Sequence, residues 1–186
     1  MFELRKQTED LTKEVHDLRE DVQKLKEENN MLIKKTSDCF DLSIRNEQYS
    51  RKSNLKIYGV KEIKGETCEE VVLSIFHEKL GITLKREEID VAHRVASHDS
   101  TKARPILIRF MSFTSRSKVL RARSKLKGSG VVIHEDIIRQ YVLLMNRLKK
   151  HERVKDVWFW NNKIHVAMND GKTHHILYGD AMPFVA

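Results

Sequence analysis

Leucine recurs at every seventh position near the start of the chain, which is the spacing of a heptad repeat. Two valines and one asparagine follow at the second core position of the heptad. The predicted seam consists of Leu4, Leu11, Val15, Leu18, Val22, Leu25, Asn29 and Leu32. Because such a stripe would stay in contact with water on a single helix, we expect residues 1–50 to form a parallel coiled coil that self-associates. The alternative is a helix that packs this stripe on its own globular domain.

After residue 53 the pattern changes to short alternating strands and amphipathic helices. The predicted order is strand 54–60, helix 69–81, strand 89–96, strand 104–113, helix 115–126 and strand 131–136. This βαββαβ order predicts a ferredoxin-like domain over residues 51–136, the arrangement that RNA-recognition-motif (RRM) domains use. Many unrelated functions share this fold, so the order alone does not assign one.

Residues 137–186 predict a small α+β domain, which makes the whole chain α+β. We expect Asp136 to cap a helix over 137–154, whose inner face carries Ile138, Tyr141, Val142, Met145 and Leu148. A β-meander with turns at "NNK" and "NDG" follows. Its first strand places Trp158 and Trp160 on one face and Val157 and Phe159 on the other. Packing in the core is the first interpretation for each tryptophan, and base stacking is the alternative.

The charge is distributed unevenly along the chain, whose net charge is +8. Residues 1–50 carry nine basic and twelve acidic side chains, whereas residues 51–186 carry twenty-six and fifteen. Between Ser100 and His134 there are nine Lys or Arg and no acid. Since like charges at this density repel, we expect a polyanion outside the chain to neutralise them, although a solvated basic face is the simpler alternative.

The predicted sheet lacks the aromatic residues on which an RRM domain stacks bases. Lys56, Pro105 and Leu107 stand where those residues would be. The open face would instead show Lys56, Tyr58, Leu107 and Arg109, beside a helix that carries Arg116, Lys118, Arg121 and Lys125. This pattern predicts binding through the phosphate backbone, with weak sequence preference and strong salt dependence.

The sequence gives little support to other classes of function. Two cysteines and scattered histidines lack ligand spacing, so we expect neither a metal nor another cofactor, and no small-molecule substrate. His134, Glu135 and Asp136 are the only clustered acid–base candidates, and without a catalytic motif we expect no enzyme. A leucine-zipper DNA-binding regulator would carry its basic region just before the zipper, where this chain has none. No apolar run suggests a membrane partner.

Several linked segments resemble one protein family. They are "RNEQYSRKSNLKIYGVKE" (45–62), "AHRV" (92–95), "ARPILIRF" (103–110), "KVLRARSKLKGSGVVIHED" (118–136) and "VWFWNNKIHVAMNDGKTHHI" (157–176). In this order the chain is similar to the first-open-reading-frame proteins of LINE-type retrotransposons. The resemblance covers nearly the whole chain.

The resemblance implies an RNA-binding protein that packages its own transcript into a ribonucleoprotein particle and acts as a nucleic-acid chaperone, with single-stranded DNA as a second partner. It implies cytoplasmic particles, with the nucleus as a further location, and a nucleic-acid-binding role for residues 137–186. Matching basic residues would contact RNA: Arg51, Lys52, Arg94, Arg104, Arg121 and, more loosely, Arg139. Family members are trimers, whereas valine and Asn29 at the a position favour two strands, so both numbers stay open. A host protein derived from such an element is the alternative.

Overall fold

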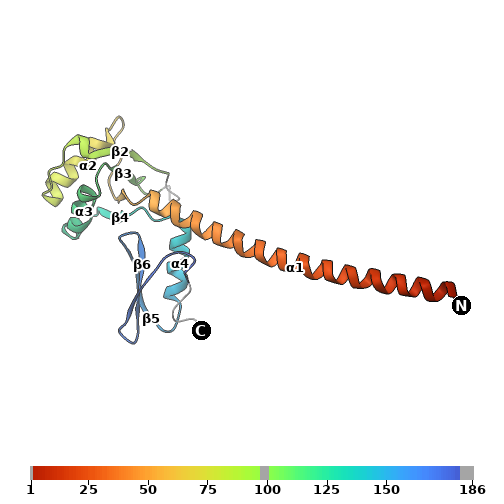
Figure 1. Ribbon diagram of the computed structural model, residues 1–186. Helices are drawn as coiled ribbons and strands as arrows, with labels where there is room; N and C mark the ends of the chain where they lie inside the picture. Colours follow the sequence, from red (N-terminus) through yellow and green to blue (C-terminus); the bar gives the residue numbers. More distant parts are fainter. Residues whose placement is uncertain (1, 97–100, 181–186) are drawn as a thin grey trace. The chain divides into compact units, whose positions relative to one another are not determined.

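The computed structural model describes residues 2–96 and 101–180, and the chain divides into two compact units, Met1–Ser43 and Ile44–Ala186. The first unit lies within one continuous helix, α1 (Phe2–Ser50), drawn in red to orange in Figure 1. Every apolar side chain of the predicted seam is exposed in the single chain, from 45% for Val15 to 69% for Leu4. Among the described residues no helix is long and apolar enough to span a membrane.

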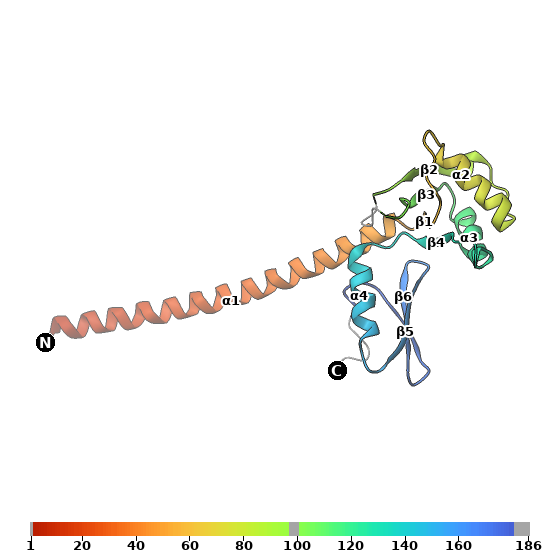
Figure 2. The ribbon, with the colours of Figure 1, turned by 180° about the vertical axis from the view of Figure 1, so that it is seen from behind.

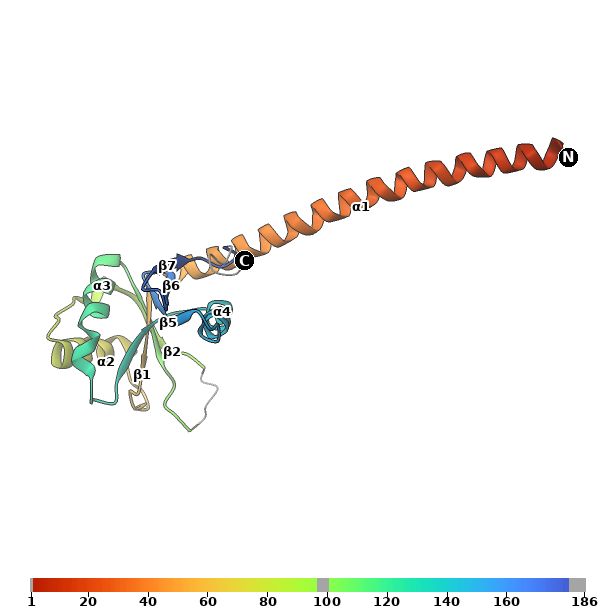
Figure 3. The same ribbon diagram turned by 90° about the horizontal axis from the view of Figure 1, so that it is seen from below.

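The second unit begins with a four-stranded antiparallel sheet. Its strands are β1 (Asn54–Tyr58), β2 (Ile89–Arg94), β3 (Ile106–Phe110) and β4 (Val132–Glu135), in the spatial order β2-β3-β1-β4. Two helical segments cover one face of this sheet (Figure 3). The first is α2 (Cys68–Ile75), which continues into a π-turn, η1 (Phe76–Leu80). The second is α3 (Phe113–Ala122), which continues into a 3₁₀ turn, η3 (Arg123–Leu126), and a short 3₁₀ turn, η2 (Arg86–Glu88), precedes β2.

Strand alternation separates a buried face from an open one. Leu55 and Ile57 of β1 are fully buried against the helices, and the residues between them point to the other face. The register sets Lys56 opposite both Leu107 and His134. The predicted set of Lys56, Tyr58, Leu107 and Arg109 therefore shares one face of the sheet.

The rest of the second unit is one helix on a three-stranded antiparallel meander. Figure 2 shows α4 (Arg139–Lys149) beside the strands β5 (Val154–Trp160) and β6 (Lys163–Met168). The third strand, β7 (Thr173–Ile176), is labelled in Figure 3 and completes the order β5-β6-β7. Asn161 and Asn162 both have positive φ, 50° and 65°, as the two-residue turn between β5 and β6 requires. Val157 and Phe159 pack on the helix, and Ile44 of α1 joins this second core. The predicted mixed α+β architecture with a long N-terminal helix is confirmed.

Three expectations for the C-terminal helix are wrong. The helix spans 139–149 rather than 137–154, because the chain is already extended in β5 at Val154. Its N-cap is Ile138 and no side chain caps it; the Asp136 carboxylate binds other partners. Val142 is exposed, and Leu144 takes its place in the core, because Tyr141, Leu144 and Leu148 share one helical face.

Candidate nucleic-acid interface

Helix α3 presents its cations on two different sides. Arg116 is only 3% exposed and forms an ion pair with Glu135 of β4. It lies on the face that carries Val119 and Leu120 into the first core, so Arg116 offers little surface to RNA, and its contact with RNA stays a prediction. The helix starts at Ser112, whose hydroxyl accepts a hydrogen bond of 3.0 Å from the Ser115 N–H.

The outer side of the same segment carries cations that no described carboxylate holds in an ion pair. Lys118 lies near enough to Glu88 for its charge to act, after the hydrogen bonds from the Ser115 hydroxyl and the Lys85 N–H, to lower the pKa of that carboxyl group. Lys118, Arg121 and Lys127 are exposed, and the residues that the structure describes place no ion-pairing carboxylate against them. Lys125 differs, because its ammonium group donates a hydrogen bond of 2.8 Å to the Leu80 carbonyl at the end of η1. We call Lys118 and Arg121 of α3, together with Lys127 just after η3, the basic face of α3.

Among the ion pairs between described residues, acids from elsewhere in the chain neutralise Arg104, Arg109 and Arg116. Arg104 pairs with Glu62 at 2.9 Å, and Arg109 pairs with Asp90 of the neighbouring strand, both at exposed positions. The hydrogen bond from Arg104 lowers the pKa of Glu62. Together with Arg116 these residues show where the expectation of wholly external neutralisation is wrong: the acids are distant in sequence and close in space.

Arg94 is a clamp between loops. Its side chain is 6% exposed and binds the Glu66 carboxylate at 2.7 Å. It also donates to three backbone carbonyls, those of Val60, Lys61 and Arg104. Its hydrogen bonds to Glu66 lower the pKa of that carboxyl group. With its donors occupied in this way, Arg94 joins the segment after β1 to the segment before β3 and presents little surface to a phosphate.

Asp136 is the centre of a second buried cluster. Its carboxylate is 1% exposed and lies 2.7 Å from Lys56 Nζ, 3.1 Å from Asn54 Nδ2 and 3.3 Å from an Arg51 nitrogen. Burial alone would raise its pKa, but the hydrogen bonds from Lys56 and Asn54 and the charges of Lys56 and Arg51 outweigh burial and lower it. Lys56 and Arg51, both predicted RNA contacts, therefore already hold an internal anion.

The end of α1 is tied to the same cluster, which the sequence pattern did not indicate. Gln48 is 1% exposed; its amide donates to the Asp136 carbonyl at 3.0 Å and accepts from the Ile138 N–H at 2.9 Å. A lone glutamine in a polar stretch gives no signal of such burial. Of the other predicted contacts, Lys52 lies over the Tyr49 ring, whereas Arg139 is exposed at the first residue of α4.

A small hollow adjoins the basic face of α3. Its lining residues come from α3, from the end of β5 and from the β5–β6 turn: Phe113, Arg116, Ser117, Leu120, Arg121, Trp160 and Asn161. The Arg123 guanidinium lies 5.5 Å from the centre of the Trp160 ring, a cation–π distance. The Asn161 N–H donates to the Glu135 carboxylate at 3.2 Å, so Glu135 connects α3 with this turn. Unpaired cations and an aromatic ring thus share one surface.

The two tryptophans have different surroundings. Trp160 is partly buried and packs against the first core, which agrees with the packing interpretation. Trp158 is 38% exposed and belongs to neither core. Strand parity predicted the face that both share, but not what covers it.

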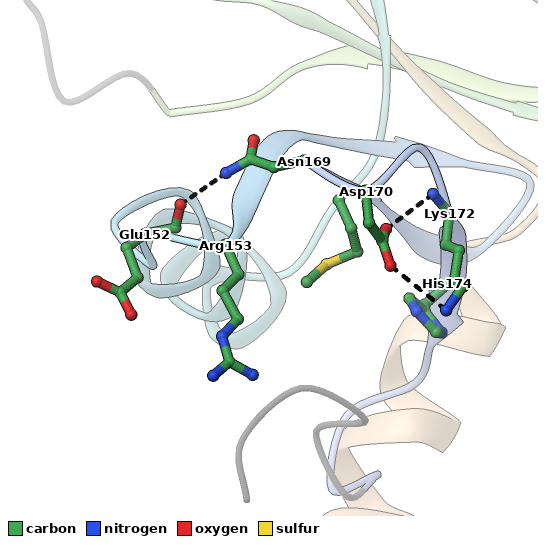
Figure 4. A pocket seen from close by; sticks show the side chains of 7 residues that line it. Glu152, Arg153, Asn169, Asp170, Lys172 and His174 are labelled. Atoms are coloured by element: carbon green, nitrogen blue, oxygen red, sulfur yellow. Dashed lines mark hydrogen bonds and ion pairs between the residues drawn. The ribbon is translucent and has the colours of Figure 1, made fainter.

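A wider hollow at the opposite end of the meander carries balanced charges (Figure 4). It is lined by Glu152, Arg153, Met168, Asn169, Asp170, Lys172 and His174. Asp170 lies 3.4 Å from Lys172 Nζ, and the Asn169 amide donates to the Glu152 carbonyl. This hollow therefore offers no concentration of one charge for a polyanion.

The acid–base candidates at the end of β4 are separated by their partners. Glu135 pairs with Arg116, and Asp136 pairs with Lys56 and Arg51. Partial burial, and to a lesser degree the charge of Arg123, lower the pKa of His134.

No family model matches the chain.

Proposed function

We propose that the protein is a self-associating, single-stranded RNA-binding chaperone of the kind encoded by the first open reading frame of LINE-type retrotransposons. One observation carries this proposal: Lys118, Arg121 and Lys127 are exposed cations against which the described residues place no ion-pairing carboxylate, and Arg121 lines the same hollow as Trp160. A surface that attracts phosphates without fixing base identity suits a protein that coats RNA.

The arrangement of elements supports the domain assignment behind this function. The βαββαβ order with strands in the order β2-β3-β1-β4 favours a ferredoxin-like, RRM-like domain over residues 51–136. The exposed leucine and valine stripe on α1 favours a coiled coil of two or three copies, because a second copy would remove that stripe from water. Residues 137–186 would form the small C-terminal domain that shares the RNA.

Chaperone activity would follow from weak contacts repeated on joined subunits. Each phosphate contact contributes little by itself and is easily broken, so strands can exchange. Copies joined through α1 would rebind quickly, because linkage raises the effective concentration of the next site. The particle would package RNA for retrotransposition without any catalytic step in this chain.

The experiment is a fluorescence-anisotropy titration of a labelled, unstructured RNA of about thirty nucleotides at increasing salt, with duplex DNA as competitor. Binding that falls steeply with salt and prefers the single strand is the expected result. The variant Lys118→Gln/Arg121→Gln should flatten the salt slope by about 1.4, since each lost contact to a single strand removes about 0.7. The control Lys149→Gln/Lys150→Gln removes the same charge at the end of α4. Equal loss in both variants, or preference for the duplex, would refute the proposal.

A further inference from the structure

Three rings form a row across the outer face of the C-terminal sheet. The register sets Trp158 of β5 opposite His165 of β6, and His165 opposite His175 of β7. Trp158 and His165 are stacked, with ring centres 5.4 Å apart and planes 18° apart, and His175 meets His165 edge-on at 4.4 Å. The other face of the sheet packs on α4, so this row lies on the face that the second core leaves open.

The row is held in place rather than loosely displayed. A ring nitrogen of His165, Nε2, lies 3.1 Å from the Trp160 carbonyl, which fixes the imidazole plane against the indole. In the neighbouring row of the same face, Ala167 stands opposite Asp156 and Thr173, so a small side chain lies beside the rings. A fixed, exposed aromatic surface loses little conformational freedom when a flat ligand stacks on it.

The charge along this face identifies the ligand class. Trp160 lies two residues from Trp158 on the same face, and the strand register sets it opposite Lys163 of β6. The Arg123 guanidinium lies over the Trp160 ring. The same Trp160 lines the hollow that Arg121 enters from the basic face of α3. The aromatic row is therefore continuous with unpaired cations. The acidic residue that β5 places on this face is Asp156. Cations that lead onto stacked rings match the alternating phosphates and bases of a single strand.

The first sheet does not offer the same surface. At the positions where an RRM domain stacks bases, β1 and β3 carry Lys56 and Leu107, and Lys56 is engaged by Asp136. We propose that the outer face of the C-terminal sheet, through Trp158 with His165 and His175, stacks unpaired bases of the strand whose phosphates the basic face of α3 holds. This inference rests on the proposed function and adds to it that the C-terminal sheet contacts the bases of the RNA.

The test compares two labelled strands of equal length, one an unstructured oligouridine and the other an abasic sugar–phosphate strand. The full chain should bind the strand with bases about tenfold more tightly, since one stacked base contributes that much affinity. Trp158→Leu should remove this preference while it keeps the affinity for the abasic strand and its salt slope. Trp158→Phe should restore most of the preference. Leu143→Ala, an exposed apolar site on α4 in the same domain, is the matched control.

Each outcome separates this inference from the proposed function. If Trp158→Leu keeps the preference for bases, stacking on this sheet is refuted while RNA binding stands. If Trp158→Leu weakens both strands equally, the ring is only structural and the inference fails. If the unaltered chain binds neither strand, the proposed function itself fails. Quenching of tryptophan fluorescence by oligouridine but not by the abasic strand, lost in Trp158→Leu, would support the inference directly.

Discussion

Lys56 Nζ lies 2.7 Å from Asp136 Oδ1, which joins the middle of β1 to the segment between β4 and α4. The backbone carbonyl of Asp136 at the same time accepts the Gln48 amide at the end of α1. One buried residue thus fixes the positions of three segments of the second unit relative to one another. The surface that we assign to RNA is built on this framework, although Asp136 itself does not reach it.

Asp136→Asn should lower the free energy of unfolding at neutral pH by about 3 kcal/mol, because Lys56 would lose its buried counter-ion. The folded-state pKa of Asp136 lies below its ordinary value of 3.8, so its stabilising effect is complete above that value. As pH falls through the folded-state pKa, Asp136 becomes protonated and the effect is lost. The difference between the two proteins should therefore shrink in acid, as measured by urea denaturation at several pH values.

Asp170→Asn provides the control for this prediction. Asp170 also pairs with a lysine, Lys172, but both side chains are exposed. Solvent screens such a pair, so the urea midpoint at neutral pH should stay unchanged. An Asp136→Asn protein as stable as the Asp170→Asn protein at neutral pH would contradict the central role of Asp136.

The elements of the fold could be predicted from the sequence because alternation and helical spacing are local. Leu55 and Ile57 alternate with polar residues, and the helix that ends at Leu80 stops at Gly81, which has a φ of 67°. The state of each cation could not be predicted in this way. Arg94 and Arg116 pair with Glu66 and Glu135, which lie 28 and 19 residues away in sequence. A count of charges along the chain does not reveal ion pairs between residues that are distant in sequence.

For the candidate interface, the sequence predicted the exposed cation Arg121 but not the surroundings of Trp158. Arg121 stays exposed and unpaired, because its side of α3 faces away from the first core. The role of Trp158 needed the structure, because parity places it on a face without saying what lies opposite. Its partner His165, and His175 that contacts His165 in turn, are seven and seventeen residues away from Trp158, on strands whose register the sequence does not specify.

Arg121 and Arg104 should differ in their effect on RNA binding, although both match basic positions of the same family. Arg121→Ala should flatten the salt slope of RNA affinity by about 0.7, the contribution of one contact to a single strand. Glu62→Gln/Arg104→Ala removes a pair whose charges already cancel, so the slope should change little. Anisotropy titrations at four or more salt concentrations would measure both slopes. A larger change in the second protein would place Arg104, and not Arg121, at the centre of the interface.

Arg116 and Glu135 should behave as one structural unit. Either Arg116→Met or Glu135→Leu leaves a buried charge without its partner and should destabilise the fold by about 3 kcal/mol. The double variant should lose less than the sum, with a residual cost of about 1 kcal/mol because the Asn161 N–H also loses its acceptor. Urea denaturation of the four proteins gives the coupling energy.

The same variants separate structure from RNA binding at this pair. Because Arg116 is buried, Arg116→Met should leave the salt slope of RNA affinity unchanged at temperatures where it is folded. Arg147→Met, at an exposed position of α4, should change stability by no more than about 0.5 kcal/mol. Additive losses in the double variant would contradict the coupling of Arg116 with Glu135. A flatter salt slope in Arg116→Met would show that the Arg116 charge contributes to RNA binding.

Leu18→Asp/Leu25→Asp should convert the protein to a monomer in sedimentation equilibrium, because two charges would fall in the seam that copies of α1 share. Affinity for a long RNA should fall by about a hundredfold as linked rebinding is lost, whereas affinity for a strand that fills only one subunit should hardly change. His16→Asp/Gln23→Asp adds the same charge at outward positions of the same heptads, so this control should keep both the mass and the affinity. The unaltered protein in the same measurement distinguishes two copies from three. A seam variant that remains oligomeric would mean that surfaces other than this stripe join the copies, and equal loss of affinity in the control would trace the effect to charge rather than to linkage.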